Sequence, residues 1–198
     1  MKLYPFQEEG VAFLTQQPRR YLADVMGLGK TVQALAALEQ AGLRRALVLA
    51  PAVTIPNWEE RAAEWAPNVD VEVVSYAATA LPSYKGRDYG ATVLDEAHYC
   101  KTPDARRTEE AHRIAAGSEI AWLLSGTPIP NHVGELYTSF KTFWPELIHE
   151  EVTTHYKWLE RYTRFSHTRY GPKVWGQRNV PEMLRMLKSV MLRRRVED

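Results

Sequence analysis

Short apolar runs alternate with helical patterns along most of the chain, and this alternation constrains the fold more than any other feature. The β-rich runs are residues 20–24, 45–50, 69–76, 91–95 and 120–126, and the helical patterns are residues 30–41, 56–65, 104–116 and 134–144. Strands that are apolar throughout are typical of sheets buried on both faces. The alternation therefore predicts an α/β fold with a mostly parallel central sheet and helices packed against it.

The pattern changes from about residue 145. Residues 155–165 look helical, residues 166–179 look like a loop or small hairpin, and residues 181–195 look helical again. Residues 1–150 carry 14 Lys and Arg against 19 Asp and Glu, whereas residues 151–198 carry 11 against 5. We therefore predict an α/β lobe at residues 1–150 and a basic helical extension at residues 151–198.

The extension is also aromatic. Its aromatic side chains in the helical and loop patterns are Tyr156, Trp158, Tyr162, Phe165, Tyr170 and Trp175. Basic residues interleaved with aromatics suit a polyanion with bases to stack on, but a solvated helical face with a buried aromatic side gives the same composition. We expect Trp158 and Tyr162, four residues apart on one helical face, to lie in the core.

Composition excludes several classes of protein. The chain has 198 residues, of which 45% are apolar, so it is long and apolar enough for a globular core. Apolar runs such as residues 46–50 are far too short to cross a membrane, so no membrane partner is expected. The single Cys100 allows no internal disulfide, which fits a reducing, intracellular compartment: cytoplasmic in a prokaryote or virus, nuclear in a eukaryote.

The stretch "ADVMGLGKT" at residues 23–31 is similar to a phosphate-binding loop. Such loops read G-x-x-x-x-G-K-[ST], and Asp24 stands where the first glycine is usual. The rest is intact: two glycines give the loop its backbone freedom, Lys30 can reach the β- and γ-phosphates, and the Thr31 hydroxyl can ligate Mg²⁺. The alternative is a glycine-rich turn that only starts a helix. A position between a strand and a helix favours the nucleotide site.

Two more clusters follow later strands. Asp95 and Glu96 are adjacent carboxylates that repel each other unless a cation or a proton offsets their charge. Mg²⁺ held by Asp95 would supply the cation, and Glu96 would take the proton of the attacking water. The alternative is an acidic pair favoured by a helix N-terminus. Ser125, Gly126 and Thr127 end the next strand, and can relay hydrogen bonds from a γ-phosphate site or form only a turn. Because ligands bind where parallel strands end, all three clusters are expected at one edge of the sheet.

Several segments in this order resemble one family, the Swi/Snf-type branch of superfamily-two helicases, which are double-stranded-DNA translocases. These segments are "LYPFQEEGVAFL", "DVMGLGKT", "LVLAPAVTIPNW", "DEAHYCK", "LLSGTPIPN" and "VMLRRRVED". The family's phosphate loop begins with aspartate, so Asp24 matches and Val25 departs. The stretch "YGPKVWGQRN" resembles the annealing-helicase sub-branch. The resemblance implies an N-terminal RecA-like lobe, a three-layer P-loop NTPase fold.

The resemblance also implies roles for individual residues, with ATP and Mg as cofactors. The catalytic residues would be Lys30, Asp95 and Glu96, and the Mg ligands Thr31 and Asp95. The cofactor-binding residues would be Gln7, Asp24, Gly27, Leu28, Gly29, Lys30 and Thr31. Residues coupling ATP to movement would be His98, Ser125, Gly126 and Thr127. Nucleic-acid contacts would be Pro51, Ala52, Ser75 and Tyr76, to which the basic extension adds Arg164, Arg169 and Lys173.

The implied partners are double-stranded or branched DNA and a second RecA-like lobe beyond residue 198, which would carry arginine fingers. We expect the 198 residues alone to hydrolyse ATP weakly or not at all. An RNA-acting helicase is one alternative, against which the aspartate-first loop and "MLRRR" argue. A non-catalytic binding module is another, against which intact Lys30, Asp95 and Glu96 argue.

Overall fold

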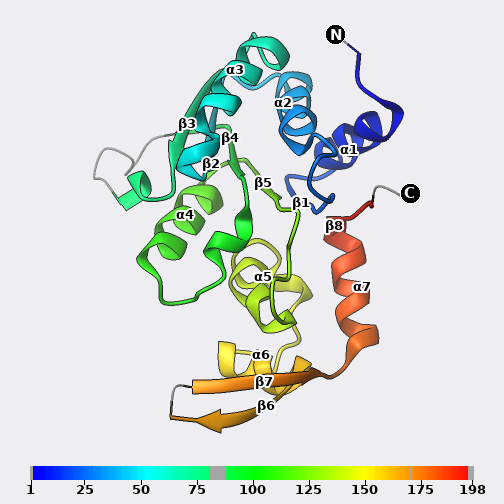
Figure 1. Cartoon of the computed structure of the whole chain (residues 1–198), viewed down its shortest axis with the longest axis vertical. Coiled ribbons are helices and arrows are strands. Elements are labelled where there is room, and N and C mark those ends of the chain that lie inside the picture. Colours follow the sequence, from blue (N-terminus) through cyan, green and yellow to red (C-terminus); the bar gives the residue numbers. More distant parts are fainter. Residues whose placement is uncertain (1, 81–87, 170, 196–198) are drawn as a thin grey trace.

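A six-stranded sheet forms the centre of the chain in the computed structural model, which describes residues 2–80, 88–169 and 171–195. Neighbouring strands run parallel in the order β3-β2-β4-β5-β1-β8 (Figure 1). The strands are β1 (Arg19–Leu22), β2 (Arg45–Ala50), β3 (Asp70–Ser75), β4 (Ala91–Leu94), β5 (Ile120–Leu124) and β8 (Met191–Leu192). The predicted parallel sheet is confirmed.

Helices cover both faces of this sheet and make a three-layer fold, as predicted. The described α-helices are α1 (Pro5–Thr15), α2 (Lys30–Ala41), α3 (Ile55–Trp65), α4 (Arg106–Gly117), α5 (Tyr137–Phe143), α6 (His155–Tyr162) and α7 (Val180–Val190). Short 3-10 turns lie at Ala52–Thr54, Ala78–Ala80, Ala97–Cys100, Val133–Leu136 and Pro145–Leu147. Among the described residues, no helix has the length and apolar character needed to span a bilayer.

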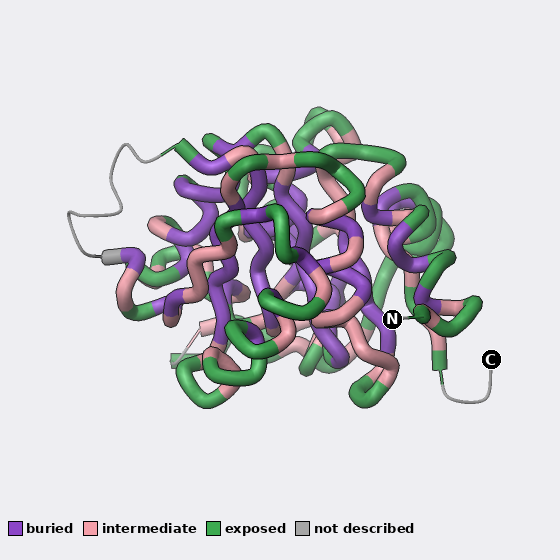
Figure 2. Tube along the Cα trace, turned by 90° about the horizontal axis from the view of Figure 1, so that it is seen from above, coloured by how far each residue is buried: buried purple, intermediate pink, exposed green. Residues whose placement is uncertain are grey.

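The alternation of side chains along β2 shows how the core divides. Ala46, Val48 and Ala50 pack into one cluster with residues of α1, α2 and α3, while Leu47 and Leu49 join a second cluster with α4, α5, α6 and α7. The sheet lies buried between the two helical layers (Figure 2). Both faces of the sheet are therefore covered by helices.

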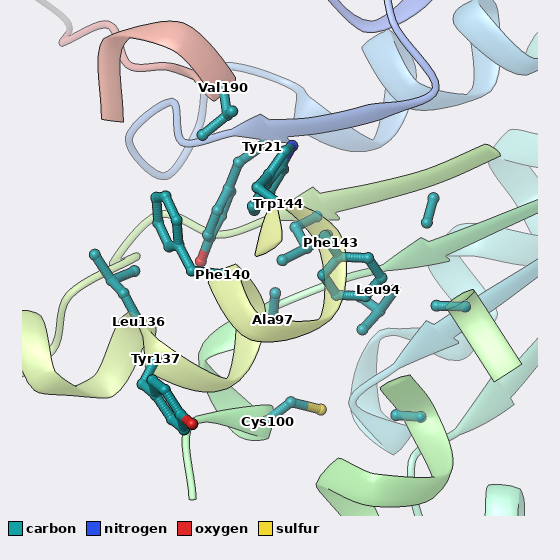
Figure 3. Packing of buried hydrophobic residues seen from close by; sticks show 14 of the residues in the cluster. Tyr21, Leu94, Ala97, Cys100, Leu136, Tyr137, Phe140, Phe143, Trp144 and Val190 are labelled. Atoms are coloured by element: carbon teal, nitrogen blue, oxygen red, sulfur yellow. The ribbon is translucent and has the colours of Figure 1, made fainter. Parts of the chain in front are cut away.

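The second cluster is dominated by aromatic rings. Tyr21 of β1 lies near Phe140 and Trp144 from the α5 region (Figure 3). Trp158 and Tyr162 of α6 have ring centroids 4.6 Å apart, and both side chains are fully buried. The prediction that these two residues belong to the core is confirmed.

The last fifty residues differ from the predicted helical extension. Residues 163–165 were expected to be helical, but Thr163 begins strand β6 (Thr163–Thr168), which pairs antiparallel with β7 (Gly171–Gln177). The reason is cross-strand pairing, which places Phe165 opposite Val174. The second expected helix ends at Val190. Met191 and Leu192 instead form β8, which pairs with the side of β1 that β5 leaves free.

Residues 1–150 and 151–198 also share one core. Met183, Met186 and Val190 of α7 lie in the same cluster as Tyr21 of β1. The extension is therefore packed onto the α/β lobe through α6, α7 and β8. The β6–β7 hairpin lies beyond α6, away from α1, α2 and α3 (Figure 1).

Candidate active site

The loop between β1 and α2 has the conformation that a phosphate-binding loop requires. Gly27 and Gly29 have φ angles of 90° and 70°, in the left-handed region, and α2 begins directly after Gly29. A Cβ added at Gly29 would lie 2.6 Å from Nε2 of Gln7, so Gln7 packs closely against the loop. The strand–loop–helix context predicted from the sequence is present, with backbone N–H groups at the start of a helix.

Lys30 is held inside this loop. Its Nζ donates hydrogen bonds to the main-chain oxygens of Asp24 (2.8 Å) and Val25 (3.4 Å). Burial lowers the pKa of Lys30, and the neighbouring carboxylates of Glu96 and Asp95 oppose that shift. The ammonium of Lys30 therefore faces the cavity, and its two carbonyl partners can be replaced by the oxygens of an anionic ligand.

Asp95 follows β4 and is almost fully buried. Its Oδ2 accepts a hydrogen bond of 2.9 Å from the indole Nε1 of Trp58, and its Oδ1 accepts one of 3.1 Å from the Glu96 backbone N–H. Burial raises the pKa of this carboxyl, while the Trp58 hydrogen bond lowers it. Sequence reasoning missed Trp58. The available signal was an indole on the helix after β2, because a buried indole N–H needs an acceptor.

Glu96, His98 and Ser125 form a compact triangle. The Ser125 hydroxyl donates to Oε2 of Glu96 at 3.1 Å, and Nδ1 of His98 lies 2.9 Å from the Ser125 oxygen and 3.2 Å from the Glu96 carboxylate. Glu96 has a φ of 49°, unusual for a residue with a side chain and typical of strained functional positions. The structure thus brings three predicted residues together from two strand ends.

The end of β5 is pressed against the phosphate loop. A Cβ added at Gly126 would lie 2.9 Å from Cγ of Met26 and 3.6 Å from Nζ of Lys30. The backbone N–H of Thr127 donates to the Ser125 hydroxyl oxygen at 3.1 Å. A shift of the phosphate loop would therefore displace Gly126 and Thr127, which were predicted to couple ATP hydrolysis to movement.

A cavity of about 510 Å³ joins these elements. Its walls include Gly27, Gly29, Lys30 and Thr31 on one side and Asp95 with Glu96 on the other. The volume falls in the range of small-molecule and cofactor sites. The wall also includes residues that were not predicted from the sequence, among them Tyr4, Trp58, Arg61 and Trp65.

The side chain of Asp24, which was predicted to bind the cofactor, has no exposed surface, and its role in cofactor binding stays a prediction. Its Oδ1 accepts from the backbone N–H and the Nε of Arg194 at 3.1 and 3.0 Å, and its Oδ2 accepts from Nη2 of Arg194 at 2.5 Å. Nε2 of Gln33 also donates to Oδ2, at 3.2 Å. Asp24 therefore anchors the segment after β8 behind the phosphate loop, because a buried carboxylate needs a charged partner.

Arg194 links three elements in this network. Its Nη2 donates to Oε1 of Gln33 at 2.8 Å, and its Nη1 donates to the main-chain oxygen of Phe6 in α1. A Cβ added at Gly10 would displace that Gln33 oxygen, so a side chain here would disturb the network. Sequence reasoning missed Gln33 and the role of Arg194, because their partner lies far away along the chain.

The predicted DNA contacts around β2 and β3 differ in exposure. Tyr76 is buried, and its hydroxyl donates a hydrogen bond of 2.6 Å to the main-chain oxygen of Asp95. Its side chain therefore supports the active site from below, and its contact with DNA stays a prediction. Ala52 is exposed, whereas Pro51 and Ser75 are half-buried; their contact with nucleic acid stays a prediction.

The donor set fits magnesium. Thr31 and Asp95 offer hard oxygen atoms, and both line the cavity. No group of three or more His, Cys, Asp or Glu side chains in the described part of the chain could hold a metal ion. Magnesium is commonly held by one or two protein ligands together with water and phosphate oxygens, so this sparse set suits it better than a metal that needs a protein cage.

The basic residues predicted to contact DNA lie on the hairpin. Arg164 is on β6, Arg169 follows it, and Lys173 is on β7, and all three are exposed. Trp175 on β7 is also exposed, whereas Tyr170 falls outside the described residues. Their role in binding nucleic acid stays a prediction.

The sequence matches the family of the SNF2-related domain at residues 6–85 and 79–198. It is 28% identical over 229 residues to the DNA annealing helicase and endonuclease ZRANB3 of Mus musculus, covering 98% of this chain and 21% of that protein. It is 29% identical over 220 residues to the SWI/SNF-related matrix-associated actin-dependent regulator of chromatin subfamily A-like protein 1 of Xenopus laevis, covering 97% of this chain and 22% of that protein.

Among solved structures, the fold is similar to the Sulfolobus solfataricus SWI2/SNF2 ATPase core in complex with dsDNA. The TM-score is 0.81 at 24% identity, over 100% of this chain and 45% of that one. At this identity the likeness establishes the fold. This chain therefore spans about a fifth of the two curated relatives and less than half of the solved core.

Proposed function

Because the chain belongs to the family of the SNF2-related domain, we propose that it is the first lobe of a DNA-dependent ATPase that moves on double-stranded DNA. The observation that carries the proposal is the convergence of Lys30, Asp95 and Glu96 on one cavity of about 510 Å³. These residues come from two different strand ends. A half-buried lysine close to two carboxylates, all lining one cavity, is the arrangement that binding of a nucleotide with magnesium requires.

The cavity residues have separate roles in ATP binding and hydrolysis. The loop N–H groups and Lys30 bind the phosphates, with Lys30 exchanging its carbonyl partners for phosphate oxygens. Gln7 packs against the loop, where it would meet the base. Glu96 accepts the proton of the attacking water, and the hydrogen bond from Ser125 and the contact with His98 hold its carboxylate in place.

Thr31 and Asp95 would hold magnesium, with Trp58 orienting the Asp95 carboxylate through its indole N–H. Magnesium, when bound, neutralises charge that develops on the phosphates. The protein's own contribution is to hold the buried Asp95 carboxylate at the cavity wall through the hydrogen bonds from Trp58 and from the Glu96 backbone N–H.

A second RecA-like lobe would complete the site. In related phosphoryl transfers an arginine supplied from outside is worth about 10³–10⁵ in rate. We therefore propose that the 198 residues alone bind ATP and turn it over weakly or not at all. Closure of the two lobes would carry the signal through Gly126 and Thr127, which lie against the phosphate loop.

Duplex DNA would lie across the surface of Ala52 and reach the hairpin, where Arg164, Arg169 and Lys173 would neutralise phosphates without reading sequence. An enzyme of this kind works where DNA is kept, so the proposal includes the intracellular location expected from the sequence, cytoplasmic in a prokaryote or virus and nuclear in a eukaryote.

ATP hydrolysis by the chain joined to a second RecA-like lobe, with duplex DNA, single-stranded DNA or RNA added, tests the proposal. We expect duplex DNA to stimulate hydrolysis most. Stronger stimulation by RNA would favour an RNA-acting helicase. Absence of hydrolysis by the folded two-lobed chain with every nucleic acid would instead favour a non-catalytic binding module, and either result would refute the proposal.

A further inference from the structure

The β6–β7 hairpin carries an exposed tryptophan that the core does not use. Trp175 keeps 64% of its surface exposed, whereas Trp58, Trp122 and Trp158 are fully buried. Indole rings bury a large apolar area when they find a partner, so leaving one in water forfeits stabilisation. The nucleotide site does not explain this side chain, since the hairpin stands apart from the cavity.

The surroundings of Trp175 form a hollow of about 520 Å³. The guanidinium carbon of Arg164 lies 5.9 Å from the centre of the indole ring, in cation–π range. Phe165, His167 and Arg178 line the same hollow. It therefore combines a flat aromatic face with cations at its margin.

The charge of the hairpin selects for an anionic partner. Between Thr163 and Asn179 the sequence has four basic residues and no Asp or Glu. Glu160 of α6 is the acidic residue at the margin of the hollow, and its Oε2 lies 3.6 Å from Nζ of Lys157. An acidic polymer is attracted along the whole ribbon.

We propose that this hollow takes an unpaired nucleobase of a DNA strand, stacked on Trp175, with Arg164 and Arg178 near the adjoining phosphates; the inference rests on the proposed function. Bases inside a duplex are already stacked and present only their edges in the grooves, so they cannot cover an indole face. Unpaired bases can, and such stacking tolerates any sequence. The preferred substrate is therefore a duplex next to an unpaired segment.

Two DNAs that differ only in an unpaired tail provide the test. The 198-residue chain would be titrated against a fluorescein-labelled blunt duplex and against the same duplex with a single-stranded tail, with fluorescence anisotropy as the readout. Trp175→Ala should weaken binding of the tailed DNA by about 5- to 150-fold and leave the blunt duplex unchanged, because a stacked base contributes about that much. Trp175→Phe, which keeps an aromatic face, should retain most of the affinity.

Leu184→Ala is the matched control, since Leu184 of α7 is 49% exposed and lies outside the hairpin. It should leave both affinities unchanged, and thermal unfolding should show that all three variants fold. An equal loss on both DNAs would overturn the inference in favour of a duplex contact. Duplex binding with no effect of Trp175→Ala would overturn the inference alone, whereas failure of the chain to bind either DNA would overturn the proposed function with it.

Discussion

Charged groups occur both at the sheet edge that holds the nucleotide site and on the β6–β7 hairpin, but the two regions differ in how deeply they bury them. At the sheet edge the carboxylates of Asp24 and Asp95 are buried, and each is held by named donors from distant elements. On the hairpin, Arg164 and Trp175 are exposed and contact each other at the surface.

The difference shows how far the fold positions the polar groups of each region before a ligand binds. A buried charge without partners costs several kcal/mol, so the polar groups of the sheet edge must be positioned by the fold itself. An exposed charge costs little, and an exposed ion pair contributes little to stability. Changes at the sheet edge should therefore alter stability or catalysis, and changes on the hairpin should alter only DNA binding.

The largest effect is expected at Glu96. Glu96→Gln keeps the shape of the side chain and removes the base, so ATP turnover by a two-lobed version of the chain should fall by about 10²- to 10⁴-fold while ATP affinity is retained. Glu59→Gln is the matched control, because Glu59 is an exposed carboxylate on α3. Normal ATP turnover in Glu96→Gln would show that Glu96 is not the general base.

The second effect separates a buried ion pair from an exposed one. Asp24→Asn leaves the Arg194 guanidinium without its charged partner and should lower the free energy of unfolding by about 3–5 kcal/mol. Asp70→Asn removes a carboxylate that lies 3.4 Å from Arg45 and is 73% exposed, so it should change stability little. Urea unfolding of both variants measures the difference, and equal losses would mean that burial does not distinguish the two pairs.

Trp58→Phe tests the donor that holds Asp95. Loss of the indole N–H should weaken magnesium binding by roughly 10- to 100-fold, as measured by the magnesium dependence of nucleotide binding. Trp122→Phe is the control, because Trp122 is equally buried and its indole nitrogen has no hydrogen-bond partner among the described residues. If both variants lost the same magnesium affinity, packing rather than the hydrogen bond would be responsible.

The same variant has a pH signature. Burial raises the pKa of Asp95, and the ionised form is the one that holds a cation, so magnesium affinity should fall as the pH drops through this raised pKa. Trp58→Phe removes a hydrogen bond that lowers the pKa and should shift the fall to higher pH. Because the folded pKa lies above the unfolded one, ionised Asp95 also costs stability once the pH exceeds both.

The smallest effect is expected on the hairpin. Reversing the charges of Arg164, Arg169 and Lys173 to Glu should reduce the slope of log affinity for duplex DNA against log salt by about 0.9 for each lost phosphate contact. Unfolding and ATP binding should not change. Reversal of three exposed residues on α4 and α5 is the control: Arg106, Arg107 and Lys141. An unchanged slope would identify the hairpin charges as solvated surface.

Much of the sheet edge could be predicted from the sequence, because each cluster of polar residues directly follows an apolar strand. Lys30, Asp95 and Ser125 were placed in this way, and parallel strands bring their ends together. The partners Trp58 and Arg194 were missed. Trp58 reaches the edge from α3, where only its indole was a signal, and Arg194 reaches it from beyond a two-residue strand. A strand of that length leaves no periodic pattern.

The hairpin was only partly predictable for a different reason. The sequence of residues 166–179 indicated a loop or small hairpin, but strand β6 begins three residues earlier at Thr163. The pairing of β6 with β7 is irregular between Arg164 and Phe165, and no local pattern shows which side chains such an irregularity leaves exposed. The exposure of the Trp175 side chain could therefore be established only from the structure.

The most direct test of the central claim, that the sheet edge is an ATP site, is equilibrium binding of ATP with magnesium to the 198-residue chain and two lysine variants. Lys30→Ala should weaken binding by about 10- to 150-fold, because it removes a charged hydrogen bond to phosphate. Lys141→Ala, which removes an exposed lysine of α5, should bind ATP as the unchanged chain does. Equal affinity of Lys30→Ala and Lys141→Ala for ATP would contradict the account.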